Sequence, residues 1–183
     1  MRIINGTHKG RVIKVPKDLP VRPTTDFAKE GLFNILNNKI NYDETKVLDL
    51  FSGTGHISLE FASRGSTDIL SVDMNSKCVG FLKATSKEFG FNIDAVKSDV
   101  FAFLKNCNQK FDMIFADPPY ELENIPTIHQ LVFDKQLLNE NGILIIEHGP
   151  RTNLESLSGF LQKRSYGNVN FSFFENPKNI LTT

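Results

Sequence analysis

Apolar and polar positions change their period along the chain in a way that predicts alternating strands and helices. From residue 46 onward, short apolar runs of strand length are each followed by a stretch in which apolar residues recur every three or four positions. The expected strands are 47–50, 69–72, 93–96, 113–116 and 143–146, and the expected helices are 56–64, 75–89, 100–107, 125–138 and 154–160. Such alternation is typical of a mostly parallel sheet with helices on its faces.

The C-terminal part of the chain follows a different pattern. Residues 162–166 and 168–174 have the composition of strands and are joined at Gly167-Asn168 by a tight turn. Strands connected by so short a turn must run antiparallel to each other. We therefore predict an α/β fold of the Rossmann-like type, with a mostly parallel seven-stranded sheet and an antiparallel C-terminal strand.

The N-terminal stretch predicts a small basic extension. Residues 2–4 and 11–15 alternate apolar and polar positions around glycines, which indicates a β-hairpin. Residues 1–40 hold eight Lys and Arg against three Asp and Glu, whereas the remaining chain holds 13 against 18. The net charge is zero, but a basic end on an acidic body suggests contact with phosphates; a solvated charged face is the alternative. We expect a hairpin extension over residues 1–24 and one domain over residues 25–183.

A helix is expected to follow this extension, with Thr25 or Asp26 as its N-cap. Apolar residues at helical spacing predict a buried stripe along it. Phe27 and Phe33 would widen that stripe.

Length and composition limit the class of protein. A chain of 183 residues can form one domain with a core of its own. Cys78 and Cys107 fit neither a zinc nor a disulfide framework, so we expect free thiols in a reducing compartment. The first residues lack the apolar stretch of a signal peptide, and no apolar run is long enough for a membrane span. We therefore expect a cytoplasmic protein that binds no membrane and, because its histidines follow no ligand spacing, no metal.

The loop after the first strand of the sheet is rich in glycine and reads Asp49-Leu50-Phe51-Ser52-Gly53-Thr54-Gly55. Ligands of doubly wound sheets bind beyond the carboxyl ends of the strands, and glycine lets the backbone approach them. Gly53 and Gly55 match two positions of the dinucleotide fingerprint, but Ser58 occupies the third. Asp49 suits a ligand ammonium and would repel a pyrophosphate. A structural turn is the alternative interpretation of this glycine loop (residues 49–55).

Acidic residues end the strands that follow. Asp73 ends the second strand, where a carboxylate can accept both hydroxyls of an adenosine ribose. Asp99, after the third strand, could accept from the adenine amino group. Helix N-capping is the alternative role for each. If the strands are parallel, Asp49, Asp73, Asp99 and Asp117 share one edge of the sheet, and this recurrence indicates a binding site because a βα junction needs no acid.

Asp117-Pro118-Pro119-Tyr120 follows a strand of buried character. The prolines have a fixed φ and no N–H, so they cannot continue the sheet. The result is a stiff exit that carries a carboxylate, free carbonyls and an aromatic ring, which suits a flat group with an amino substituent. A rigid turn without a ligand is the alternative.

These features together resemble class I amino-methyltransferases, and the N-terminal motifs resemble the RsmD family within that group. The resemblance rests on Met1-Arg2-Ile3-Ile4-Asn5-Gly6, Gly10-Arg11, Arg22-Pro23-Thr24-Thr25-Asp26, Glu30-Gly31-Leu32-Phe33-Asn34, the glycine loop and Asp117–Tyr120. It covers essentially the whole chain. It implies transfer of a methyl group from S-adenosylmethionine to N2 of a guanine in 16S ribosomal RNA. One departure is that Phe27 and Lys29 stand where family members often carry arginine.

The resemblance also implies the residues of the site. Asp117 and the Pro118 carbonyl would accept the two N–H bonds of the target amine, and Tyr120 would stack on the unstacked base. The cofactor would be bound by Asp49, Phe51, Ser52, Gly53, Thr54, Gly55, Asp73, Met74, Asp99 and Val100. The RNA would be contacted by Arg2, Lys9, Arg11, Arg22 and Thr24. The expected product is S-adenosylhomocysteine, the expected partner is 16S rRNA or the small ribosomal subunit, and a monomer is expected.

Three other functions remain open at this point. An adenine-N6 methyltransferase acting on DNA or RNA would grip its amine with the same four residues, although the N-terminal motifs favour guanine. A nicotinamide-dependent oxidoreductase is disfavoured by Phe51 and by the missing third glycine. A non-enzymatic nucleotide-binding module is disfavoured by the presence of Asp117 and Tyr120.

Overall fold

The computed structural model describes residues 1–17, 19 and 25–176, which contain seven strands and five α-helices. The helices are α1 (Asp26–Leu36), α2 (His56–Ser63), α3 (Ser76–Phe89), α4 (Val100–Asn106) and α5 (Ile125–Asp134), with a short 3-10 helix at Tyr42–Glu44. The strands are β1 (Lys46–Leu50), β2 (Asp68–Asp73), β3 (Ile93–Lys97), β4 (Phe111–Ala116), β5 (Leu138–His148), β6 (Phe160–Tyr166) and β7 (Val169–Glu175). In the described ranges no helix is both long and apolar enough to cross a membrane.

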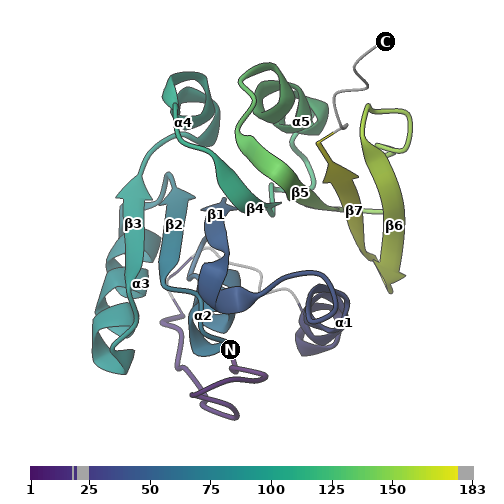
Figure 1. The fold of residues 1–183 in the computed structure, drawn as a ribbon. Coiled ribbons are helices and arrows are strands. Elements are labelled where there is room, and N and C mark those ends of the chain that lie inside the picture. The colour runs from purple at the N-terminus through teal and green to yellow at the C-terminus, as the bar shows by residue number, and fades with distance from the viewer. Residues whose placement is uncertain (18, 20–24, 177–183) are drawn as a thin grey trace.

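All seven strands form one sheet in the order β3-β2-β1-β4-β5-β7-β6 (Figure 1). Strands β1 to β5 are parallel, whereas β7 pairs antiparallel with both β5 and β6. The strand order reverses between β1 and β4, which is where doubly wound sheets bind ligands. The predicted fold class is confirmed, including the antiparallel strand at the C-terminal end.

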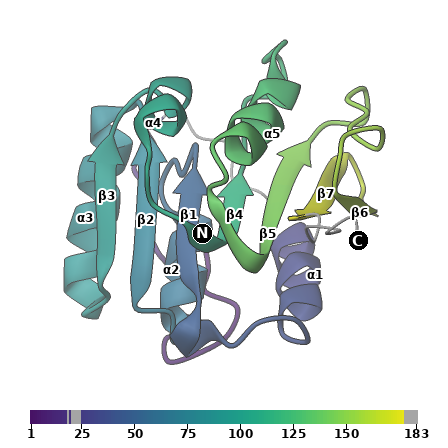
Figure 2. The ribbon, with the colours of Figure 1, turned by 45° about the horizontal axis from the view of Figure 1, so that its top comes forward.

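Two hydrophobic cores cover the two faces of the sheet. Figures 1 and 2 show α4 and α5 on one face and α1, α2 and α3 on the other. Strand β4 divides its side chains between them, because successive residues of a strand point to opposite faces. Met113 and Phe115 pack with α1, α2 and α3, whereas Ile114 and Ala116 pack with α4 and α5. Burial on both faces explains why this strand is apolar at nearly every position.

Helix α1 begins as the sequence predicts. The Thr25 side chain caps it by accepting from the Ala28 N–H at 3.2 Å. Its apolar stripe is buried, and Phe33 widens it as expected. Phe27 does not widen the stripe, because its side chain is 70% exposed and lies at the outer side of the helix.

Helix α5 is shorter and β5 longer than the predicted 125–138 and 143–146. The helix ends at Asp134, and Gln136 adopts a positive φ of 52° that stops helical continuation. The chain then turns so that Leu138 pairs with Phe111 in the sheet. Leu138, assigned to the last helical turn, therefore begins the next strand, and Leu137 precedes it.

The predicted helix over 154–160 is wrong. Residues 154–159 form turns, in which Asn153 Oδ1 accepts from the Glu155 N–H at 2.9 Å, and Phe160 begins β6. Leu154, Leu157 and Phe160 nevertheless pack against the core beneath α4 and α5. Their three-residue spacing thus marks anchors of a loop, and the positive φ of 72° at Gly159 turns the chain into β6.

The N-terminal segment pairs with itself only briefly. A single antiparallel bridge joins Arg2 and Val12, and the Ile3 N–H donates to the Arg11 carbonyl at 3.0 Å. Ile3 and Ile13 enter the same core as α1 and α2. The expected hairpin is therefore short: backbone hydrogen bonds join residues 1–3 to residues 10–13, and packing against the larger domain holds it.

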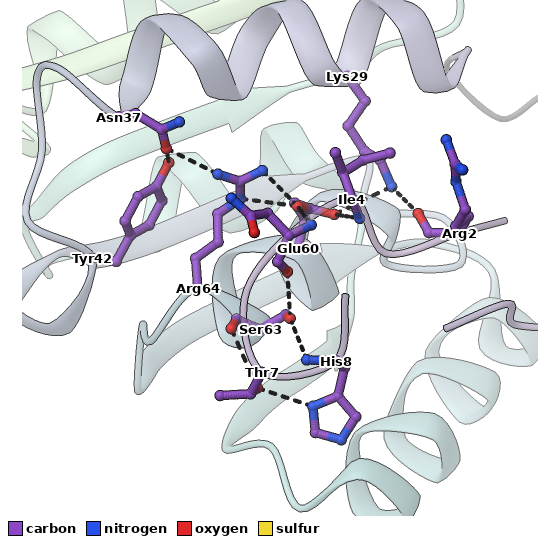
Figure 3. Close-up of polar contacts among 11 residues, drawn as sticks. Arg2, Ile4, Thr7, His8, Lys29, Asn37, Tyr42, Glu60, Ser63 and Arg64 are labelled. Carbon is purple, nitrogen blue, oxygen red and sulfur yellow. Dashed lines mark hydrogen bonds and ion pairs between the residues drawn. The ribbon is translucent and has the colours of Figure 1, made fainter. Parts of the chain in front are cut away.

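A buried ion network fixes this segment to the domain. Glu60 in α2 accepts from the N–H groups of Ile4 and Asn5 at 2.8 and 3.0 Å (Figure 3). Its carboxylate also pairs with Lys29 Nζ at 3.5 Å and with Arg64 at 2.8 Å. Burial lowers the pKa of Lys29, and the Glu60 charge opposes that shift. The network joins α1, α2 and the N-terminal segment.

Candidate functional site

Acidic residues gather at one edge of the sheet, as the sequence predicts. They are Asp49 near the end of β1, Asp73 at the end of β2, Asp99 after β3 and Asp117 after β4. The parallel pairing of these strands puts all four at the same edge. We call it the carboxyl edge of the sheet.

The glycine loop turns sharply between β1 and α2. The Ser52 N–H donates to the Val72 carbonyl at 3.1 Å and ties the loop to β2. Phe51, Gly53 and Gly55 have positive φ values of 57°, 51° and 78°. This conformation is easy for glycine but strained for Phe51, and backbone strain concentrates at functional sites.

Packing explains the second glycine of the loop better than ligand approach does. A Cβ at Gly55 would lie 2.3 Å from Cδ1 of Leu82 in α3, so a side chain there would displace Leu82 and would also be strained by the positive φ. The side chains of Ser52 and Thr54 are buried, and these residues therefore offer a ligand mainly their backbone. Gly53 differs because its N–H reaches across to the next strand.

Asp73 connects the glycine loop to β2. Its Oδ2 accepts from the Gly53 N–H at 2.8 Å, and its Oδ1 accepts from the Asn75 N–H at 2.7 Å. The N-cap of α3 is Asn75, whose side chain accepts from the N–H groups of Lys77 and Cys78. Asp73 is therefore not the cap, and its predicted role at a ribose stays open. The neighbouring Met74 exposes its side chain at the same edge.

Asp99 is the N-cap of α4, so the N-capping role that the sequence left open for this residue is confirmed. Its Oδ1 accepts from the Ala102 N–H at 2.8 Å at the start of α4. Asp99 is exposed, so its carboxylate is also accessible to a ligand, and contact with adenine stays a prediction. Val100 is buried in the core, which leaves only its backbone for the predicted cofactor contact.

Asp49, at the start of the glycine loop, is only 1% exposed. Its Oδ2 accepts from the Ser58 N–H at 3.2 Å and from the Ser58 hydroxyl at 2.5 Å. Ser58 Oγ is also 2.7 Å from Ser71 Oγ. Burial raises the pKa of Asp49 to about 7, against the lowering effect of the Ser58 hydrogen bonds. A cation brought near this buried carboxyl would favour its charged form.

Three polar side chains meet where β4 and β5 end. Asp117 follows β4, and its N–H donates to the Leu50 carbonyl at 3.2 Å. Glu147 lies beside it on β5, and the Tyr120 hydroxyl donates to Glu147 Oε1 at 2.9 Å. Burial, followed by the charges of Glu147 and Asp49 and a hydrogen bond with Glu147, raises the pKa of Asp117 well above its usual value. The two carboxyls therefore tend to share a proton.

The neighbouring backbone completes this array of Asp117, Glu147 and Tyr120. A Cβ at Gly149 would come within 3.0 Å of Tyr120 Cδ2, so the tyrosine ring packs directly on the backbone. Among the described residues, no group donates a hydrogen bond to the Pro118 carbonyl. The carbonyl that the sequence predicts as a free acceptor is thus available.

Glu147 is the member of the array that sequence reasoning missed. It follows the apolar run 143–146, so it is an acid at a strand end like the other four. The rule that singled out Asp117 would have found it.

The residues predicted to contact RNA lie in different places. Arg2 pairs with Asp26 at 3.3 Å near the start of α1. Arg11 pairs with Glu88 at 3.6 Å. Glu88 is near the C-terminal end of α3, and that end lies away from the carboxyl edge of the sheet. Lys9 is exposed on the same loop as Arg11. Arg22 and Thr24 lie outside the described residues.

The Arg2 and Arg11 side chains therefore pair with acids on different helices, and contact of the N-terminal basic residues with RNA stays a prediction. Over the described ranges, His, Cys, Asp and Glu side chains do not gather in any group of three or more that could hold a metal ion.

The whole-chain pattern has a counterpart among known protein families. Residues 1–175 match the family described as conserved hypothetical protein 95. The chain belongs to this family. The resemblance to RsmD proteins is confirmed, because several relatives of this family member carry the name ribosomal RNA small subunit methyltransferase D.

Two relatives and two solved structures show how similar this chain is to known methyltransferases. Putative rRNA methyltransferase YlbH of Bacillus subtilis is 32% identical over 175 residues, covering 91% of this chain and 94% of that protein. Ribosomal RNA small subunit methyltransferase D of Escherichia coli K12 is 29% identical over 148 residues, covering 80% and 74%. The structure of putative methyltransferase yhhF from Escherichia coli has a TM-score of 0.82 at 25% identity, covering 96% and 97%. The 16S rRNA N2 methyltransferase RsmC of Thermus thermophilus shares the fold, with a TM-score of 0.68 at 22% identity, covering 86% and 45%.

Proposed function

We propose that this chain transfers a methyl group from S-adenosylmethionine to the exocyclic N2 of a guanine in 16S ribosomal RNA. The observation that carries the proposal is the array of Asp117, Glu147 and Tyr120, which lies across the switch point from the glycine loop. Relatives named rRNA methyltransferases support the reaction class. The structure of RsmC, a 16S rRNA N2 methyltransferase bound to AdoMet and guanosine, shares this fold and supports the choice of cofactor and base.

The residues around the glycine loop fit a nucleoside cofactor. Asp73 would accept from the ribose hydroxyls, and its bonds to the N–H groups of Gly53 and Asn75 keep its carboxylate in place. The exposed side chain of Met74 offers an apolar surface beside it for the adenine ring. Asp49, buried at the start of the loop, would face the methionine ammonium. The bound cofactor would supply an electrophilic methyl group with a neutral thioether as its leaving group.

The array fits the amine that accepts the methyl group. An exocyclic amine on a purine has its lone pair delocalised into the ring, so it must be oriented before it can attack. Asp117 and the Pro118 carbonyl would accept its two N–H bonds and direct the lone pair. Tyr120, fixed by Glu147 and by the backbone at Gly149, would stack on the base.

The carboxyl pair also fits the charge that the reaction creates. When Asp117 and Glu147 share one proton, the pair carries one negative charge, with Glu147 buried and Asp117 partly buried. That charge would stabilise the positive charge developing on the amine nitrogen. The same pair would then accept the proton that the methylated nitrogen releases.

The test is methyl transfer from labelled S-adenosylmethionine to purified small ribosomal subunits and to naked 16S RNA, followed by nucleoside analysis. We expect N2-methylguanosine in one of the two substrates. The product N6-methyladenosine would establish the adenine-N6 alternative instead. Absence of transfer to both substrates, with cofactor binding intact, would refute an rRNA substrate.

A further inference from the structure

We propose that the groove between α1 and β6 binds single-stranded RNA that flanks the methylated nucleotide. This proposal rests on the proposed function, because it extends the same substrate beyond the reacting base. The α1–β6 groove has a volume of about 950 Å³ and is open to solvent. Its walls are the outer side of α1, from Phe27 onward, and the edge strand β6, from Leu161 to Tyr166.

The groove lies on the same face of the sheet as the array. Glu147 is two residues after Ile145 and four after Ile143, so it shares their face of the sheet, where they pack with α1. Asp117 shares the face of Met113 and Phe115 for the same reason. The side chains of Asp49, Asp117 and Glu147 therefore point to the α1 face. Tyr166 packs against that same core from β6.

The groove also opens at the same edge as the array. β6 is parallel to β5, because both pair antiparallel with β7. Asn170 of β7 pairs with His148 on one side and with Ser165 on the other, so Tyr166 ends level with the end of β5. Two strand spacings, or about 10 Å, separate these two ends. A strand of RNA leaving the array along the sheet would reach the groove directly.

The side chains at the near end of the groove suit a nucleobase. Phe27 is 70% exposed and meets the Tyr166 ring edge-on, with ring centroids 5.6 Å apart and an interplanar angle of 80°. Tyr166 is held against Gly31, where a Cβ would lie only 2.2 Å from its Cε1. The fixed tyrosine thus supports an exposed aromatic face on which a base can stack.

The charges along the groove suit a phosphate backbone. Arg164 and Lys39 line it, and no carboxylate of the described residues forms an ion pair with either. Glu30 is the one acid among the lining residues, so the lining carries a net positive charge. By contrast, Lys163 on the other side of β6 is paired with Glu155. Side-chain amides of asparagine and glutamine fill the wall between these charges and can bond to base edges.

The test compares the binding of a short labelled single-stranded RNA containing the target guanine to wild type, Phe27→Ala, Phe27→Tyr, Arg164→Ala and Lys163→Ala. Loss of stacking at Phe27 or of the charge at Arg164 should weaken binding roughly tenfold. Arg164→Ala should also reduce the slope of log affinity against log salt by about one. Phe27→Tyr keeps a ring and should bind like wild type, as should the matched control Lys163→Ala.

Methyl transfer separates this proposal from the proposed function. If wild type methylates RNA, the Phe27→Ala and Arg164→Ala variants should show a raised KM for RNA and an unchanged kcat. Unchanged RNA affinity in both variants would overturn the groove while leaving the function intact. If transfer fails on every ribosomal substrate but both variants still lose RNA binding, RNA binding in the groove is supported and the proposed rRNA methylation is refuted. Weakened binding to subunits with unchanged binding to naked RNA would assign the groove to a ribosomal protein and overturn the proposal.

Discussion

Replacing Glu147 by glutamine should stabilise the folded protein at high pH while lowering methyl transfer. Glu147 is only 3% exposed and lies beside Asp117, whose pKa is raised by burial and by the Glu147 charge. An amide at this position still offers an oxygen to the Tyr120 hydroxyl, now 2.9 Å from Glu147 Oε1. The substitution therefore removes the charge repulsion and keeps the hydrogen bond.

The structure sets the size and the sign of this effect. Two unit charges about 5 Å apart, the spacing of neighbouring strands, repel by about 3 kcal/mol at an effective dielectric constant of ~20. Screening by solvent at the partly exposed Asp117 reduces the expected gain to about 1–2 kcal/mol.

A carboxyl with a raised pKa in the folded state holds more protons there than in the unfolded chain. For Asp117, stability is therefore lost as pH rises from its ordinary pKa of 3.8 through its raised value. The gain from Glu147→Gln should be small near pH 4 and fully developed above the raised pKa.

Urea unfolding at a series of pH values measures this difference in the free energy of unfolding. The matched control is Glu140→Gln, an exposed acid on the same strand, which should leave the pH dependence as in wild type. Methyl transfer by the Glu147→Gln variant should fall, because the pair loses the charge that stabilises the reacting amine. A variant that is less stable than wild type at high pH, or equally active, would refute the reasoning.

Three further predictions follow from the site and from the ion network. Asp117→Ala should lose methyl transfer by at least about a hundredfold and still bind S-adenosylmethionine, which calorimetry can check; full activity would exclude its role in orienting the amine. Asp73→Ala should weaken cofactor binding, because both the ribose contact and the anchor of the Gly53 N–H disappear, and unchanged affinity would exclude Asp73 from the cofactor site. Glu60→Gln should lower the free energy of unfolding by about 3–5 kcal/mol in urea titrations, since Lys29 would stay buried without its counter-charge. Glu88→Gln, at the exposed pair with Arg11, is its control, and an equal loss there would contradict the importance of burial.

Local sequence patterns were sufficient for most of the fold and for half of the site. The alternation of strand and helix periods leads to a parallel sheet, and parallel strands bring the acids at their ends to one edge whatever the details of packing. Asp117 and Asp73 could be found in this way. The limits of α5 and β5 could not, because Leu137 and Leu138 fit the apolar spacing of a helix as well as a strand, and only the pairing of Leu138 with Phe111 shows where the strand begins.

The sequence by itself determined the class of fold, the acidic edge and the family, because each depends on short-range spacing or on residue type. Only the tertiary structure decided how these residues act on one another. In the structure Glu147 lies beside Asp117 and accepts from the Tyr120 hydroxyl, and Asn75 is the N-cap of α3. The Phe27 side chain points outward at the α1–β6 groove. Arg11 pairs with Glu88 at the end of α3 that lies away from the carboxyl edge of the sheet. Such contacts join segments far apart in the chain, and their geometry depends on the packing of whole helices and strands.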